Sequence, residues 1–467
     1  MRALKLHTTA LALIAMTATG AAAADVYGPF PITLKGYEGE KTNSVSYSGQ
    51  IARHALHDSL KKAAALGNGG ANAAEVEALL LSYFNGSDAD LEILAPTSKD
   101  GFPIKQATVN AISKGKNISG KFYGGAMPAW PGNGTGKDAV LHMIAKAAQS
   151  DSGFDAENGY DYGQLISKFT MGAMNYNQSV DNYLDEKLAA DNKPNNKPYK
   201  DGAYYTGKEH SWDEGFGYWG GPAHTLSLTP TQAYSIAKGK DLAAADANGD
   251  GVVDLKTEYV FGPAYYAAGA DKGGTKSTNY MHTIMQAFID GRQIITHANG
   301  EALSDEARAA LKAQAAIIEA NWEKVLAEAA FKYAGSVYTD ITKLGETEGE
   351  DKAKAYRAYV KHWGELKGFA MALQSGRNNL GATAVELNKL IGFGPVTLDN
   401  SYVTGVDAAG NFVRDRKMTW NDYQLNMLKT QDLLKGKFGL KSLANDQLAE
   451  LEGLAGKLEA EASAETD

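Results

Sequence analysis

The residues with the clearest chemical pattern form an aspartate-rich run near the middle of the chain. Oxygen donors recur at every second position of this run, and Gly251 stands sixth. That spacing suits a loop that curls around Ca²⁺, because the glycine permits a sharp turn and the alternate oxygens converge on one hard cation. The pattern assigns these calcium ligands: Asp246, Asn248, Asp250, the carbonyl of Val252, Asp254 and Glu258.

The end of this run departs from the calcium pattern. Thr257 stands where a bidentate glutamate is expected, and Glu258 follows one residue late. Either Glu258 completes the site after a backbone adjustment, or the site is weakened. The alternative interpretation is a surface turn, because Asp, Asn and Gly all favour turns. As a calcium site, the loop is expected to be a structural clip with a dissociation constant of roughly 10⁻⁴–10⁻³ M, as in extracellular modules.

Four histidines precede a carboxylate by three or four residues, the spacing that places both groups on one face of a helix. Such a pair can chelate one metal ion or serve as an acid–base couple. Chance accounts for some of these pairs, and for His54 and His297 we favour helix-surface ion pairs or a polar cap. The pairs are His54 with Asp58, His210 with Asp213 and Glu214, His297 with Glu301, and His362 with Glu365.

The segment around His210 is the most informative of these. On a helix, His210, Asp213 and Glu214 share one face. Trp212 and Phe216 lie on the other face, where they can anchor the helix in a core. A rigid helix that presents a histidine and carboxylates suits a transition-metal site. The alternative is an interior helix whose histidine and acids satisfy one another.

A second segment, from His362 to Phe369, has the same outline of histidine, nearby tryptophan, acid three residues on, and then glycine and phenylalanine. The repetition is consistent with a remnant of internal duplication. If the two segments face each other, His362 and Glu365 can contribute to the site of His210. Histidine and carboxylate ligands without sulfur suit iron, zinc or manganese, and the sequence does not select among these metals.

Composition limits the classes of function. The chain has 467 residues, with 46 Lys and Arg against 55 Asp and Glu, so its formal charge is −9. An acidic chain lacks the dense basic surface that nucleic acids require, so we expect no nucleic-acid partner. Cysteine is absent, which excludes disulfides, thiolate catalysis, cysteine-ligated metals and lipid attachment through an N-terminal cysteine.

Residues 1–24 have the pattern of a secretory signal peptide. Arg2 and Lys5 precede a short apolar stretch, and Ala21 to Ala24 supply small residues for cleavage. The apolar stretch is shorter than the ~20 residues that a membrane span needs. We therefore expect an exported protein of the periplasm that is not a lipoprotein; full secretion is the alternative location.

Helical periodicity dominates the elements that must position these residues, and alternating β patterns are scarce. We expect an all-α fold of two four-helix-type bundles packed around a cleft. The predicted units are an N-terminal bundle over 25–240 with the His210 segment, an inserted loop over 241–275 with the calcium-like site, and a C-terminal bundle over 276–467 with the His362 segment. Helices are predicted over 44–66, 75–84, 137–149, 162–188, 279–295, 304–337, 351–374, 419–434 and 446–461.

Several segments resemble the imelysin-like families, a group that includes iron-regulated periplasmic proteins of bacteria. The resemblance is carried by Val45–Gln50 with Arg53-His54, by Lys208–Tyr218, by the aspartate-rich loop and by Glu365–Ala370. It implies a two-bundle, all-α fold with a cleft, a metal site built around a GxHxxE-type motif, and a link to iron acquisition. The founding members are described as metallopeptidases and related proteins chiefly as binding proteins.

This sequence departs from that motif at two positions. Gly207 lies three residues before His210 rather than two, and the acid three residues after the histidine is Asp213, with Glu214 next. The identity of the metal ligands therefore stays open between these two acids. The departure also weakens a peptidase assignment, because no separate general base is apparent.

These features predict a periplasmic protein that binds iron or another transition metal during metal acquisition. The expected partners are a metal ion or metal-bearing ligand and an uptake protein of the outer or inner membrane. One alternative is a metal-dependent peptidase of imelysin type. The other is a polysaccharide- or surface-binding protein that calcium stabilises.

Overall fold

The computed structural model describes residues 25–87, 89–376 and 380–464. The segment predicted as a signal peptide, residues 1–24, lies outside the described residues. Among the residues that the structure describes, no helix has both the length and the apolar character needed to cross a membrane.

The described chain is predominantly helical, which confirms the expectation of an all-α protein in its coarse form. The α-helices are α1 (Ser48–Ala63), α2 (Ala73–Asn85), α3 (Val109–Ile112), α4 (Gly136–Gln149), α5 (Tyr162–Thr170), α6 (Gly207–Trp219), α7 (Pro230–Ile236), α8 (Gly262–Gly273), α9 (Tyr280–His297), α10 (Asp305–Gly345), α11 (Gly349–Ala372), α12 (Ala382–Ile391), α13 (Trp420–Phe438) and α14 (Leu451–Ala464). A π-helical segment, η3 (Met171–Tyr183), continues α5. Short 3₁₀ turns are η1 (Ala64–Leu66), η2 (Ser119–Lys121), η4 (Glu186–Leu188), η5 (Thr225–Ser227), η6 (Leu242–Ala244) and η7 (Leu448–Glu450).

The strands are short antiparallel ladders. β1 (Phe154–Asp155) pairs with β2 (Tyr160–Asp161), with Phe154 opposite Asp161. β3 (Ser401–Tyr402) pairs with β6 (Arg416–Lys417), and β4 (Gly405–Val406) pairs with β5 (Phe412–Val413). Each ladder is two residues long, so these strands join loops and form no layer of their own.

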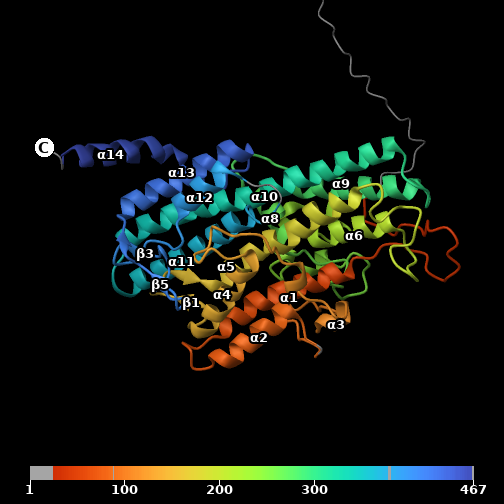
Figure 1. The fold of residues 1–467 in the computed structure, drawn as a ribbon, viewed down its shortest axis with the longest axis horizontal. Helices are drawn as coiled ribbons and strands as arrows, with labels where there is room; N and C mark the ends of the chain where they lie inside the picture. The colour runs from red at the N-terminus through yellow and green to blue at the C-terminus, as the bar shows by residue number, and fades with distance from the viewer. Residues whose placement is uncertain (1–24, 88, 377–379, 465–467) are drawn as a thin grey trace, which may run out of the picture.

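The longest helix, α10, organises the packing. It contacts α8, α9, α11 and α13, and α11 in turn packs on α5. In Figure 1, α1 and α2 lie along one side of the molecule and α12 and α13 along the opposite side, with α5, α10 and α11 between them. The range 241–275, predicted as an inserted loop, contains the loop at 246–258 but also the helix α8, whose alanines Ala264, Ala267 and Ala268 are buried.

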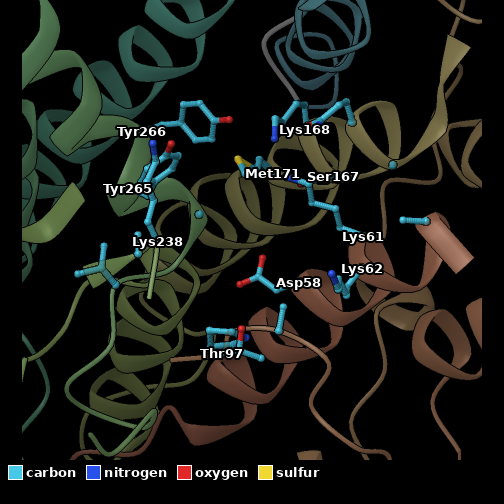
Figure 2. A pocket seen from close by; sticks show the side chains of 18 of the residues that line it. Asp58, Lys61, Lys62, Thr97, Ser167, Lys168, Met171, Lys238, Tyr265 and Tyr266 are labelled. Carbon is cyan, nitrogen blue, oxygen red and sulfur yellow. The ribbon is translucent and has the colours of Figure 1, made fainter. Parts of the chain in front are cut away.

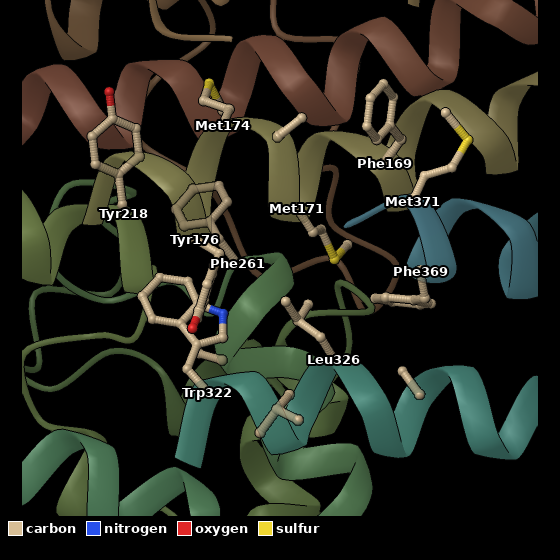
Figure 3. Packing of buried hydrophobic residues seen from close by; sticks show 14 of the residues in the cluster. Phe169, Met171, Met174, Tyr176, Tyr218, Phe261, Trp322, Leu326, Phe369 and Met371 are labelled. Carbon is tan, nitrogen blue, oxygen red and sulfur yellow. The ribbon is translucent and has the colours of Figure 1, made fainter. Parts of the chain in front are cut away.

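The hydrophobic core runs through both halves of the chain. Buried side chains from Tyr27 to Leu443 form one continuous cluster. Figure 3 shows part of it, where Met171 of η3 points toward Leu326 of α10, with Phe369 of α11 to one side. Trp322 of α10 packs edge-on against Tyr176 of η3, with ring centroids 5.8 Å apart. Apolar burial therefore ties the helices before residue 240 to those after residue 276.

Candidate functional site

The helix that carries His210 begins with a reciprocal cap. The Thr206 hydroxyl accepts a hydrogen bond from the Glu209 N–H, and the Glu209 carboxylate accepts one from the Thr206 N–H at 2.8 Å. Such a capping box satisfies two of the free N–H groups at a helix start. At the other end, Gly220 adopts φ +71°, a left-handed conformation that glycine tolerates well. α6 is thus fixed at both ends and holds its side chains in defined directions.

His210 lies between two tyrosine rings. It stacks on Tyr205 at 4.3 Å and meets Tyr199 edge-on at 4.3 Å between ring centroids. Its Nε2 is 3.8 Å from Glu214 Oε2, and its Nδ1 is buried without a hydrogen-bond partner among the described residues. Burial lowers the pKa of His210, and Glu214 partly opposes that shift. His210 and Glu214 therefore remain neighbours, as the i+4 spacing predicts.

Asp213 points into a buried network instead of toward His210. Its Oδ1 accepts hydrogen bonds from the Tyr27 hydroxyl at 2.7 Å and from Arg292 Nε at 3.0 Å. Its Oδ2 accepts one from the Ser46 N–H at 3.0 Å. Both oxygens are thus in use, and a metal at Asp213 would have to displace these donors. The interpretation of Asp213 as a metal ligand stays a prediction.

Arg292 of α9 is the centre of this network. It is fully buried, and its guanidinium reaches Glu209 Oε1 at 3.4 Å as well as Asp213. It also donates to the Ser44 hydroxyl at 2.5 Å and lies 4.8 Å from the centroid of the Phe30 ring. The network, called here the Arg292 cluster (Arg292, Asp213, Glu209, Ser44 and Tyr27), joins the segment before α1 to α6 and α9.

The His362 segment is paired differently from its sequence pattern. His362 Nδ1 is 2.6 Å from Asp340 Oδ2 of α10, rather than next to Glu365. Glu365 accepts a hydrogen bond from the Tyr333 hydroxyl at 3.1 Å and lies 3.6 Å from Lys168 Nζ. No hydrogen bond, ion pair or ring contact among the described residues joins His210 to His362. The meeting of the two histidine segments in one metal site stays a prediction.

The two other histidine pairs also differ from expectation. His54 is 1% exposed, stacks on Phe261 and has Nε2 3.1 Å from the Gly217 carbonyl, so it is an interior residue and not half of a surface ion pair. Burial lowers its pKa to about 4. His297 is exposed at the end of α9, while Glu301 pairs with Lys35 at 3.6 Å.

The aspartate-rich loop curls around its own side chains. Asp246 Oδ1 accepts the N–H of Gly249 at 2.8 Å, and Asp246 Oδ2 accepts that of Gly251 at 2.9 Å. Asn248 Oδ1 accepts the N–H of Asp250 at 2.8 Å, and Asp250 Oδ1 accepts that of Val252 at 3.1 Å. The alternate oxygens therefore face the inside of the loop, the direction that a cation ligand needs.

The two acids at the end of the loop are held by groups outside it and at its start. Asp254 accepts from Gln106 Nε2 at 2.7 Å and lies 3.2 Å from Lys105 Nζ. Glu258 is 3% exposed, and it accepts the N–H of Ala247 at 3.2 Å and of Asp254 at 2.7 Å. Glu258 thus turns back to the loop start, the direction required if it is to replace the missing twelfth-position glutamate.

Across the part of the chain that the structure describes, no three histidine, aspartate or glutamate side chains are grouped so that they could hold a metal ion. A cation in the 246–258 loop would also draw on the Asn248 amide and the Val252 carbonyl. A transition metal at His210 would need ligands beyond the histidine and Glu214.

The structure also contains a lysine-lined pocket of about 490 Å³, which no sequence motif indicated. Figure 2 shows Lys61 and Lys62 of α1 and Lys168 of α5 on one side, with Tyr265 and Tyr266 of α8 on the other. The remaining charged residues that line it are Asp58, Lys99, Asp161, Lys238 and Arg357. The one sequence signal was a lone lysine, Lys168, within the apolar stretch from Leu165 to Met171.

Comparison with known protein families assigns the chain to one family. Residues 36–392 match the model of a family described as a domain of unknown function, DUF4856. The chain belongs to the DUF4856 family. Within this DUF4856 chain, the match covers α6, the aspartate-rich loop, the His362 segment and every residue of the lysine-lined pocket. No curated protein matches the chain, and no solved structure matches it.

Proposed function

We propose that this DUF4856 protein is an exported, metal-binding protein that binds Ca²⁺ in the 246–258 loop and acts by binding a ligand, not by hydrolysis. The observation that carries the proposal is the loop itself, in which the side-chain oxygens of Asp246, Asn248 and Asp250 turn inward. Hard cations prefer carboxylate, amide and carbonyl oxygens at this spacing. Bound Ca²⁺ would offset the charge of Asp246 and Asp250 and of the nearby Glu258.

The expected effect of calcium is a gain in stability. A ligand that binds only the folded state stabilises it by RT ln(1 + [L]/Kd), which is about 2.7 kcal/mol when its concentration is about a hundred times Kd. With a Kd of roughly 10⁻⁴ M, about 10 mM calcium reaches that range, and about 1 mM calcium gives about half of it. The loop pins Val253 beside Ile104, so the gain should appear in global unfolding.

The test is thermal unfolding of the mature chain with CaCl₂ and with MgCl₂ at equal ionic strength, together with calorimetric titration of Ca²⁺. Asp250→Ala removes one inward oxygen while breaking only the bond to the Val252 N–H. The matched control is Asp407→Ala, since Asp407 also accepts nearby backbone N–H groups in an exposed turn. The proposal fails if wild type shows no calcium-specific shift, or if Asp250→Ala keeps the whole shift.

A transition-metal function at His210 is a second proposal, and one observation favours it. His210 and Glu214 are 3.8 Å apart, and His210 Nδ1 has no partner among the described residues. Iron or zinc bound there would support a role in metal acquisition with a membrane uptake protein as partner. The test is elemental analysis of the untagged protein after reloading. His210→Ala with Glu214→Ala must lower iron or zinc content, and an unchanged stoichiometry would refute this role.

The peptidase alternative receives less support from the geometry. A metal-dependent hydrolase needs a general base in addition to the metal ligands. Among the described residues, Glu214 is the only carboxylate in ion-pair distance of His210, so one group would have to serve both purposes. We therefore favour a binding function.

We also propose the two-bundle arrangement with a cleft. Support comes from the lysine-lined pocket, whose walls combine α1 and α5 from the first half with Arg357 of α11 from the second. Limited proteolysis tests this division, since two bundles predict that the first cleavage falls in the exposed part of the connection, between residues 247 and 251. The imelysin-like resemblance also stays a proposal, and the segments Lys208–Tyr218 and Glu365–Ala370 support it.

A further inference from the structure

We propose that the lysine-lined pocket binds a small hydroxylated organic anion, whose carboxylate or phosphate group lies between Lys61 and Lys168. The inference concerns a different site from the calcium loop and does not depend on a cation there. It rests on the geometry of the pocket, the burial of Lys168 and the charge balance of the walls.

The pocket has the size and construction of a small-molecule site. Its volume of about 490 Å³ falls within the range of roughly 300–1,000 Å³ that is typical of ligand pockets. In Figure 2 the carboxylate of Asp58 lies between the lysine side and the tyrosine side, and Met171 lies toward Lys168. Three helices, α1, α5 and α8, hold these side chains on rigid supports.

Lys168 is a buried cation whose ion-pair partner lies beyond hydrogen-bond distance. Its side chain is 3% exposed, and its ammonium has no hydrogen-bond acceptor among the described residues. Glu365 forms an ion pair with Lys168 at 3.6 Å, and the same Glu365 oxygen accepts a hydrogen bond from the Tyr333 hydroxyl. Burial and the neighbouring Lys61 lower the pKa of Lys168 to about 7. An anion between the two ammonium groups would relieve both the burial cost and their repulsion.

The charge balance of the walls favours an anion. Arg357 and Asp161 form an ion pair at 2.7 Å and offset each other. Of the five lining lysines, Lys168 is paired with Glu365, which does not line the pocket, and the other four face a single lining aspartate, Asp58. The chain as a whole has a net charge of −9, so this local excess of cations runs against its composition. Clefts lined by one sign of charge attract ligands of the other.

A neutral hydrogen-bond acceptor in the pocket indicates which group the rest of the ligand carries. Gln164 lines the same pocket, and its Oε1 is buried without a hydrogen-bond donor among the described residues. A ligand hydroxyl that donates to Gln164 Oε1 would satisfy it. A carboxylate or phosphate joined to a hydroxylated body, as in a sugar acid or sugar phosphate, matches both requirements.

The test is calorimetric titration of the full mature chain with four probes: glucuronate, glucose 6-phosphate, inorganic phosphate and glucose. We expect at least one of the first two to bind and neutral glucose not to bind. Binding of glucuronate alone identifies a carboxylate site. Binding of glucose 6-phosphate with inorganic phosphate identifies a phosphate site. Lys168→Met should weaken binding by about tenfold or more, the loss expected for one charge-assisted hydrogen bond.

Two further variants make the test specific. Asp58→Asn removes the opposing charge of the pocket and should tighten binding several-fold. Lys367→Met is the matched control, because Lys367 is also a buried lysine whose pKa burial lowers to about 7. Unlike Lys168, Lys367 donates to the Gly392 carbonyl at 2.6 Å and does not line the pocket. If Lys168→Met does not fold, the half-exposed Lys61→Met takes its place.

Three results would overturn the proposal: no probe binds with a dissociation constant below about 10 mM, glucose binds as well as the anions, or the lysine variants of the pocket bind no more weakly than Lys367→Met. None of these depends on calcium, so failure here is distinguishable from failure of the calcium proposal.

Discussion

Replacement of Arg292 by methionine tests whether the Arg292 cluster stabilises the fold. The guanidinium is fully buried and serves Asp213 at 3.0 Å and Glu209 at 3.4 Å. Methionine keeps part of the side-chain volume but leaves both carboxylates buried without a cation. We therefore expect the variant to be less stable throughout the neutral pH range.

The magnitude follows from the cost of an uncompensated buried charge. Removing one partner of a buried ion pair costs about 3–5 kcal/mol. At an unfolding entropy of about 2.1 cal/mol/K per residue, a chain of this length would melt about 3–5 °C lower. The lost bond from Arg292 to the Ser44 hydroxyl adds to this, because Ser44 is itself buried.

The assay is urea denaturation followed by far-ultraviolet circular dichroism, with the denaturation slope compared between variants. Arg308→Met is the control, since Arg308 pairs with Asp305, whose side chain is 89% exposed. An exposed pair of this kind contributes about 1 kcal/mol or less. A double variant, Arg292→Met with Asp213→Asn, should cost less than the two single changes together, because a neutral amide does not require the cation.

A stability of Arg292→Met within about 1 kcal/mol of wild type would refute this reasoning. Additive costs in the double variant would refute it as well. Either result would mean that Asp213 does not depend on Arg292 to compensate its charge.

Two further predictions concern stability. A Cβ at Gly291 of α9 would lie 2.0 Å from Trp212, so Gly291→Ala should lower the free energy of unfolding by about 1–3 kcal/mol in urea denaturation. The control is Gly269→Ala in α8, where the nearest atom to a new Cβ is 3.5 Å away, and it should be neutral or stabilising by up to about 1 kcal/mol. Equal effects of the two variants would contradict this packing. Burial lowers the pKa of His54 to about 4 and of His57 to about 3, so the unfolded chain binds more protons and stability falls as pH drops below about 6.5, by about 1.4 kcal/mol per pH unit for each histidine. Burial raises the pKa of Asp58 to about 6, so the folded chain binds this proton before the unfolded chain does. Protonation of Asp58 therefore stabilises the fold over the same pH range and offsets part of this loss. Urea midpoints at successive pH values measure the slope, which His54→Gln should reduce; a slope unchanged in that variant would contradict the assignment.

Local patterns predicted much of the fold. The apolar period over 304–337 located α10, and polar residues followed by apolar spacing over 44–66 located α1, because helix periodicity depends on neighbours three and four residues apart. The inward turn of Asp246 and Asn248 also follows from local rules, since those side chains bond N–H groups two to five residues away. α8 was missed because its glycines and alanines read as a loop, while its helix is stabilised by packing on α7, α9 and α10.

The same local rules misplaced several side chains of the candidate site. His362 pairs with Asp340, which lies 22 residues earlier, although Glu365 is its nearest acid on the helix. Glu365 instead faces Lys168, on a helix nearly two hundred residues away in sequence. Periodicity states which residues share a face, but it does not state which neighbouring element that face will meet.

The sequence by itself determined that this protein is helical, that the 246–258 run curls around its own oxygens, and that His210 and Glu214 lie one turn apart. Tertiary structure alone decided that Asp213 faces Arg292, 79 residues away, and that Ser44 joins the same guanidinium across 248 residues. It also decided that Lys61 and Lys168 line one pocket. The physical reason is that helix formation depends on contacts within a few residues, whereas the burial of a charge is settled by whichever distant segment supplies its partner.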